Sequence, residues 1–337
     1  MTSRRVLIVG ALLLAGVAIL AIGVGSVAIA PSEVIGILVH RVFGVGESAQ
    51  SAGATSIVIE LRLPRILAAI LVGAALAVVG GAFQSLLRNP LADPYVLGTS
   101  SGAALGAAIA ILLPIGGVAW ELGGVQVAAF VGALASVALV WRVAGIGSGE
   151  ERIASVLLVG YAVASLLAAA LSLVMLASGA NLRAIFSFLL GGLDGASWPR
   201  LAAAALPLAL ATTLLALRGR PLAGLLLGDQ AALHLGVDVR RERRIAVALA
   251  SLATAAAVAL AGLVGFVGLV VPHLARLAVG PDPRAVLPLS AIGGALLLLL
   301  ADTIARSIGV PVGVVTALIG APFLLWLLHR ARTGYAL

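Results

Sequence analysis

The sequence predicts an all-α protein that crosses a membrane about ten times. Of its 337 residues, 62% are hydrophobic and only 10% are charged, whereas soluble domains carry about 25% charged residues. A soluble domain of this length could not cover its surface with so few charges, and disordered chains are poor in apolar residues. Long apolar runs recur along the chain, while a membrane barrel would show short segments of alternating polarity.

Ten apolar runs are candidates for the roughly 20 residues that a helix needs to cross a bilayer core of about 30 Å. The runs lie near 6–30, 66–87, 95–113, 122–141, 153–177, 200–217, 245–263, 266–279, 285–303 and 313–328. The run at 266–279 is too short for an ordinary full crossing. Because backbone polar groups in lipid must bond within the protein, the runs are predicted to be helices. Residues 1–337 are predicted to form a single transmembrane domain.

The first run has two interpretations, an uncleaved helix and a signal peptide. Arg4 and Arg5 give it a basic start, and Ala28-Ile29-Ala30 resembles a cleavage site. However, the run is longer than the apolar stretch of about 7–15 residues that is usual in a signal peptide. Pro31 directly follows the candidate site and disfavours cleavage, so the uncleaved helix is the preferred interpretation.

The basic residues predict the orientation, because cytoplasmic loops of membrane proteins are enriched in them. All 21 are Arg. If the N-terminus is cytoplasmic, fifteen fall inside: Arg4, Arg5, Arg88, Arg142, Arg152, Arg218, Arg220, Arg240, Arg241, Arg243, Arg244, Arg276, Arg284, Arg330 and Arg332. Six fall outside: Arg41, Arg62, Arg65, Arg183, Arg200 and Arg306. The excess predicts that both termini are cytoplasmic.

Two missing residue types exclude whole classes of chemistry. Without Lys the chain cannot carry a phosphate-binding loop of the G-x-x-x-x-G-K-[ST] type or a Schiff-base lysine. Without Cys it has no disulfide, thiolate nucleophile or Cys-ligated zinc. The four His are scattered, so no metal site and no catalytic residue is expected: they are His40, His234, His273 and His329. Most Arg lie in short loops between apolar runs, which argues against nucleic-acid binding.

Carboxylates are scarce within the apolar runs. Asp302 is the nearest to an intramembrane acid, and it lies close to the predicted outer end of its helix. A proton-coupled carrier would be expected to have at least one ionisable residue in mid-membrane. The scarcity indicates that the energy for any pumping comes from elsewhere, although a channel or a purely structural membrane subunit would need none.

Two sets of glycines have patterns that suggest close backbone approach. Gly98, Gly102 and Gly106 form a small-xxx-small face that allows tight helix contact. A second set lies where the seventh run meets the short eighth, and with the proline that follows it predicts a broken helix at membrane depth: Gly262, Gly265, Gly268 and Pro272. Such backbone is tolerated only where protein or a cavity surrounds it. Ordinary packing glycine is the alternative for both sets.

The longest cytoplasmic connection spans residues 218–244. Within it, Leu225 to Gly236 has the composition of a short helix, with Asp229 as a plausible N-cap and Gly236 as a stop. Ala232, Leu233 and Leu235 would supply apolar surface. A short helix in water is poorly stable alone, so this one either packs into a partner's groove or lies against its own membrane domain.

Three long segments together resemble the FecCD-type permeases, which are membrane subunits of bacterial ABC importers for ferric siderophores, haem and cobalamin. The first is LRLPRILAAILVGAALAVVGGAFQSLLRNPLADPYVLGTSSGAALG (61–106). The second is GLLLGDQAALHLGV (224–237), which is similar to the family's coupling segment. The third comprises 262–306 and 310–328, which resemble its C-terminal half.

The resemblance implies the BtuC-like type II importer fold, with ten transmembrane helices per subunit and a homodimer whose pathway lies on the dyad. It also implies two separate ATPase subunits that bind ATP and Mg, so that this chain itself binds no cofactor. An extracytoplasmic (periplasmic) substrate-binding protein and the lipid bilayer complete the partners. The implied location is the bacterial plasma (inner) membrane, with several crossings.

The same resemblance assigns roles to particular residues. The ATPase coupling helix maps onto Gly228, Asp229, Ala231, Ala232, Leu235 and Gly236. Arg62, Arg65 and Arg306 match outward-facing positions that receive carboxylates of the binding protein, with interfacial anchoring as the alternative. The mouth of the pathway maps onto Asn181, Arg183, Gly191 and Gly192. Arg183 would attract an anionic cargo, but it does not distinguish siderophore, haem and cobalamin.

The expected function is therefore import of a metal chelate through an ATP-driven permease that is not itself an enzyme. A secondary transporter driven by an ion gradient is the main alternative, and a membrane scaffold without transport is a weaker one.

Overall fold

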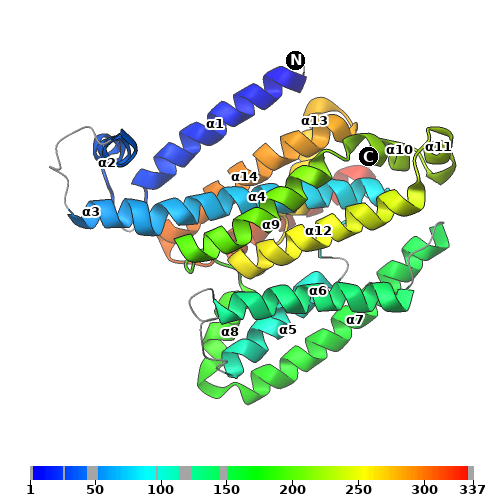
Figure 1. Ribbon diagram of the computed structural model, residues 1–337, viewed down its shortest axis with the longest axis horizontal. Helices are drawn as coiled ribbons and strands as arrows, with labels where there is room; N and C mark the ends of the chain where they lie inside the picture. Colours follow the sequence, from blue (N-terminus) through cyan, green and yellow to red (C-terminus); the bar gives the residue numbers. More distant parts are fainter. Residues whose placement is uncertain are drawn as a thin grey trace.

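The computed structural model describes residues 3–25, 27–43, 52–95, 98–113, 123–144 and 150–332. In these ranges the chain forms helices and the turns between them (Figure 1). The helices are α1 (Ser3–Gly23), α2 (Pro31–Phe43), α3 (Ala52–Ser56), a π-helical segment (Ile57–Arg62), α4 (Leu63–Leu86), α5 (Thr99–Leu112), α6 (Gly124–Ala144), α7 (Glu150–Ala177), a 3₁₀ turn (Gly179–Asn181), α8 (Leu182–Leu189), α9 (Trp198–Ala216), α10 (Gly219–Leu226), α11 (Asp229–His234), α12 (Val239–Ala261), α13 (Val267–Val279), α14 (Pro283–Ile308) and α15 (Val312–Arg332).

The predicted all-α polytopic fold is confirmed. Among the described residues, eight helices are long and apolar enough to cross a membrane, and α5 and α13 are shorter apolar helices. Each of the ten predicted runs therefore has its own helix, and α13 is short as expected. The run at 95–113 was counted as a full crossing, but α5 begins only at Thr99 because Gly98 has a left-handed φ of 75°.

Helix α4 lies at the centre of the bundle, in contact with α9, α12, α13 and α14 (Figure 1). The helices α5, α6 and α7 pack on one another as a second layer, which α12 joins to the first. Few residues of α1 and α7 are buried, as expected for surfaces that face lipid or another subunit. Two ends of the bundle matter below. The α3 end holds α3 and the start of α4, and the α11 end holds α10, α11 and the start of α12.

Close approach of backbones holds the centre together. A Cβ on Gly80 would lie 1.8 Å from the carbonyl oxygen of Gly268, so only glycine fits where α4 crosses α13. The three glycines Gly98, Gly102 and Gly106 do not share one role. Gly102 and Gly106 lie against the backbone of α6, whereas Gly98 makes the turn into α5.

A glutamine satisfies the backbone group that a proline leaves unpaired inside α13. Pro272 has no N–H, so the carbonyl of Gly268, four residues earlier, loses its helical partner. The buried side chain of Gln84 on α4 donates its Nε2–H to that oxygen at 3.2 Å. Polar backbone groups away from water need such partners, and this contact ties α4 to α13.

Candidate functional site

The break between α12 and α13 spans residues 262–266. Helix α12 ends at Ala261 because Gly262 adopts φ 65°, and α13 begins after Phe266, which has a left-handed φ of 68°. A Cβ on Gly262 would lie 2.4 Å from the carbonyl oxygen of Phe188, so the break also needs glycine for space. Gly265 lies in the break, while Gly268 and Pro272 lie inside α13.

The backbone of this break bonds to two other segments. The hydroxyl of Tyr95 donates to the carbonyl of Val264 at 3.0 Å and accepts from the Val264 N–H at 3.2 Å. The N–H of Gly192 donates to the carbonyl of Ala261 at 2.8 Å. Beside Tyr95, burial raises the pKa of Asp93, whose carboxylate accepts the Tyr95 N–H at 2.8 Å.

The residues assigned to the pathway mouth lie next to this break and divide between two cavities. Asn181 and Gly192 line a cavity of about 460 Å³ together with Gly262. Arg183 is exposed and lines a second cavity of about 800 Å³. Gly191 has φ 69°, and a Cβ there would lie 2.3 Å from the Leu263 carbonyl oxygen. The structure thus brings the assigned mouth and the assigned break together at the α3 end.

The larger cavity also gathers the three arginines that were assigned to docking. Arg62, Arg65 and Arg306 line it with Arg183, and Asp194 lies on its wall. Asp194 also lines the smaller cavity, so it lies where the two meet. Four guanidinium groups and one carboxylate give this cavity a net positive lining, which favours an anionic or acidic partner.

Two of these arginines hold the end of α1. Arg62 donates to the carbonyl oxygen of Ile22 at 2.5 Å and to that of Val27. Arg306 donates to the carbonyl of Ala21. The last carbonyls of a helix have no partner within it and carry its negative dipole end, so both cations cap α1. Arg62 is only 6% exposed, and its guanidinium is bound to these carbonyls.

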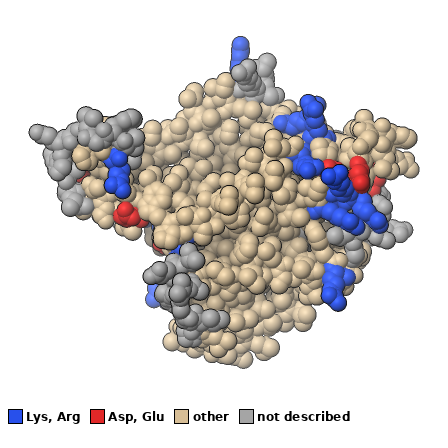
Figure 2. Space-filling model, viewed as in Figure 1, with Lys and Arg blue, Asp and Glu red and all other residues tan. Residues whose placement is uncertain are grey.

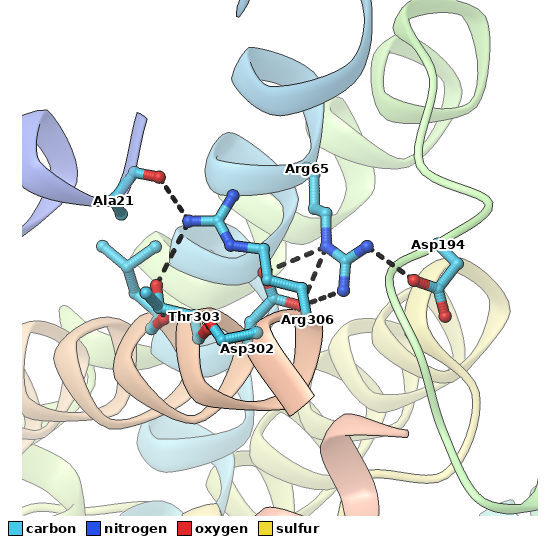
Figure 3. A network of polar contacts seen from close by, with 8 residues as sticks. Ala21, Arg65, Asp194, Asp302, Thr303 and Arg306 are labelled. Atoms are coloured by element: carbon cyan, nitrogen blue, oxygen red, sulfur yellow. Dashed lines mark hydrogen bonds and ion pairs between the residues drawn. The ribbon is translucent and has the colours of Figure 1, made fainter. Parts of the chain in front are cut away.

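Arg65 lies between two carboxylates (Figure 3). Its Nε and Nη2 donate to Asp302 at 2.8–3.0 Å, and its Nη1 donates to Asp194 at 2.5 Å. Asp302 is fully buried in α14, whereas the side chain of Asp194 is 76% exposed. The one acid that the sequence placed near the membrane interior is thus neutralised by an intramolecular ion pair.

At the α11 end, an ion pair fixes the segment that was assigned to coupling. Asp229 Oδ1 lies 2.7 Å from Arg243 Nη2 of α12 and 4.0 Å from Arg88 Nη2. The expectation that Asp229 is the N-cap is wrong, because Gly228, with φ 107°, holds that position and Asp229 lies in the first turn. Figure 2 shows arginines gathered at this end of the visible face.

The rest of the segment divides into a buried and an exposed side. Ala232 is fully buried and packs near Gly224 of α10, so it does not add to the apolar surface as expected. Leu233 and Leu235 are exposed, at 61% and 63%, and Leu227 before α11 is exposed at 70%. Ala231 is half-buried, and Gly236 is exposed with φ 76°. Residues 225–236, which have the composition of a short helix, form the end of α10 and the whole of α11, separated at Leu227 and Gly228.

Among the residues that the structure describes, no three His, Cys, Asp or Glu side chains lie close enough together to hold a metal ion.

Comparison with known proteins identifies the class of molecule. Residues 12–330 match the FecCD transport family, so the chain belongs to that family of membrane transport proteins.

Among its relatives is the cobalamin import system permease protein BtuC of Halobacterium salinarum, 45% identical over 85% of this chain and 76% of that protein. The ABC transporter permease protein YvrB of Bacillus subtilis is 39% identical over 98% of this chain and 95% of the relative. The hemin transport system permease protein HmuU of Yersinia pestis is 40% identical over 81% and 83%. The chain is thus an ABC-type permease with multiple membrane crossings.

Solved structures agree with this fold. A proposed metal-chelate type ABC transporter in an inward-facing conformation matches with a TM-score of 0.81 and 29% identity, over 97% of this chain and 99% of the other. A chain of PsaBC from Streptococcus pneumoniae shares the fold only, with a TM-score of 0.55 and 18% identity over 77% and 88%.

Four residues that the sequence did not single out contribute to these sites. Tyr95 and Gln84 form hydrogen bonds with backbone groups at helix irregularities. Arg243 forms an ion pair with Asp229, and Asp194 forms one with Arg65. A signal existed for Gln84, because a polar side chain inside an apolar run needs a partner. Nothing local distinguishes Asp194, whose partner is 129 residues away.

Proposed function

We propose that this chain is the permease subunit of an importer that moves a metal chelate into the cytoplasm, driven by ATP hydrolysis on separate ATPase subunits. The observation that carries the proposal is the exposed leucine surface on and beside α11, formed by Leu227, Leu233 and Leu235. The ion pair of Asp229 with Arg243 holds this surface against the bundle.

The leucine surface suits a partner in the aqueous phase. Burying a leucine side chain contributes about 1.5–3 kcal/mol, and a six-residue helix is too short to be stable alone. Docking would bury these side chains, while the fixed base of α11 would transmit the partner's motion to α12. The partner is inferred to be an ATPase because a chain without Lys has no phosphate-binding loop of its own.

The α3 end suits an acidic partner outside the membrane. Its larger cavity is lined by the exposed Arg183 and by Arg65, whose Nη1 donates to the exposed Asp194. We infer that carboxylates of a substrate-binding protein dock here. Single exposed ion pairs contribute only about 0–1 kcal/mol, so several pairs, doubled in a homodimer, would be needed. This arrangement requires both termini to be cytoplasmic, as the arginine distribution indicates.

The proposed cargo is a chelate of the cobalamin, haem or siderophore class. The relatives named for cobalamin and hemin import support this class. The cargo would pass along the dyad of a homodimer, and recognition would reside mainly in the binding protein. Each partner can shift the permease between conformations only through a difference in affinity for them.

Uptake into reconstituted vesicles tests the proposal against the ion-gradient alternative. Cobalamin, haemin and a ferric siderophore serve as probes, each with its cognate binding protein outside the vesicle. We expect uptake of one probe only when the ATPase and internal ATP are present. Uptake by this chain alone with a proton gradient would establish the secondary carrier, and absence of uptake in every combination would support a scaffold.

A further inference from the structure

Asp302 fixes the orientation of the Arg65 guanidinium. It binds Nε at 3.0 Å and Nη2 at 2.8 Å, from a fully buried position on α14. Two of the three nitrogens are therefore committed to the interior of the protein. Nη1, which carries two N–H groups, is the nitrogen that Asp302 leaves open to other carboxylates.

Asp194 occupies this remaining nitrogen. Its Oδ1 lies 2.5 Å from Arg65 Nη1, although its side chain is 76% exposed (Figure 3). Asp194 belongs to the connection between α8 and α9 and lies on the wall that the two cavities share. A carboxylate of the chain itself thus takes the position that a partner's carboxylate would need.

We propose that Asp194 is a built-in competitor for the docking partner's carboxylate at Arg65, and that it sets the affinity of docking. The inference rests on the proposed docking function. Nη1 has two N–H groups, but a second carboxylate bound to it would lie beside Asp194, and the repulsion between the two like charges favours displacement of Asp194 on docking. The displacement is feasible because an ion pair with one exposed member is weak, whereas the buried contact with Asp302 stays in place.

The other charges around Asp194 are consistent with this role. Arg62 and Arg306 line the same cavity but are bound to the carbonyls of α1. Arg183 is exposed on the cavity wall and remains positioned to take a second acidic group. The partner surface that fits is therefore an exposed pair of carboxylates.

The segment that contains Asp194 is also hydrogen-bonded to the break between α12 and α13. Two residues before Asp194, the N–H of Gly192 donates to the carbonyl of Ala261, the last residue of α12. A partner that displaces Asp194 from Arg65 therefore acts on a segment that is hydrogen-bonded to this break. The contact gives docking a direct physical link to the assigned pathway mouth.

The test measures docking of the purified binding protein encoded beside this chain to the full-length permease in lipid nanodiscs. Asp194→Asn removes the competing charge, and we expect it to tighten the Kd about two- to fivefold, as for an exposed ion pair. Glu60→Gln is the matched control, because it removes an exposed acid at the same end. Equal tightening by Glu60→Gln would overturn the proposal in favour of a general charge effect.

A second variant separates this inference from the docking function. Arg65→Lys keeps a cation for Asp302 but lacks the guanidinium fork that also reaches Asp194. We expect Arg65→Lys to weaken docking and to make Asp194→Asn ineffective. If Arg65→Lys weakens docking but Asp194→Asn alone leaves the Kd unchanged or raises it, the competitor role is refuted. If Arg65→Lys docks as tightly as the wild type, the docking function of Arg65 fails as well.

Discussion

The α3 end and the α11 end both carry arginine–aspartate pairs, but they present opposite surfaces to a partner. At the α3 end, Arg65 is bound by two aspartates, and Arg62 and Arg306 hold the carbonyls of α1. At the α11 end, Asp229 and Arg243 form the base of a segment whose leucines are exposed. At the α3 end, Arg62 and Arg65 have partners within the chain. At the α11 end, leucine side chains are exposed.

The difference suggests two ways of meeting a partner. At the α11 end a partner only has to cover leucines, so binding adds contacts without breaking any. At the α3 end the proposed partner competes with Asp194 for Arg65, so binding there would be an exchange. Contacts between exposed charges are screened by salt, so the proposed docking at this end should be the more salt-sensitive of the two.

The largest effect is expected at the buried pair of the α3 end. Arg65→Leu leaves the carboxylate of Asp302 buried without its partner, and breaking a buried pair costs about 3–5 kcal/mol. Thermal unfolding of the detergent-solubilised protein measures the loss. The double variant Arg65→Leu with Asp302→Leu is the control, because replacing both charges with apolar groups is often neutral.

A single variant as stable as the double variant would contradict the ion pair. Charge reversal at Arg65 is a poor test of docking, because it places a second acid beside the buried Asp302 and destabilises the fold before any partner binds.

A smaller effect is expected at the base of α11. Asp229→Ala removes the partner of Arg243, whose side chain is 8% exposed, and hydrogen bonds to charged groups contribute about 1.5–3 kcal/mol. Amide hydrogen exchange in residues 229–236 should become faster, while exchange in α4 stays unchanged. Asp282→Ala is the matched control, because its pair with Arg284 is exposed on both sides. Unchanged exchange in 229–236 would show that the ion pair does not hold this segment.

Helix positions were predictable from the sequence, because apolar length is a direct requirement of the bilayer. The break at Gly262 was predictable in place, since glycines there interrupt an apolar pattern. What the pattern could not give was the partner of each polar group. Asp302 was found as a rare acid, but its pairing with Arg65 spans 237 residues and depends on how α4 crosses α14.

The candidate sites show the same limit. Asp229, Ala232 and Leu235 were assigned by resemblance to the coupling segment. Asp229 and Ala232 turn inward, whereas Leu235 is exposed together with Leu227 and Leu233. Sequence position within a six-residue helix cannot say which side faces the bundle. Arg62 was assigned to docking by resemblance, and the sequence alone does not show that its guanidinium binds a carbonyl of α1 40 residues away.

The central claim is that the exposed leucines at the α11 end bind the ATPase. The most direct test is a titration of the nanodisc-embedded permease with its purified ATPase, using the variant Leu233→Asp with Leu235→Asp. Two central apolar contacts should each contribute about 2 kcal/mol or more, so association should weaken at least about a hundredfold. Gln230→Asp, which adds one carboxylate at an exposed polar site of α11, should bind normally. Wild-type affinity in the leucine variant would contradict the account.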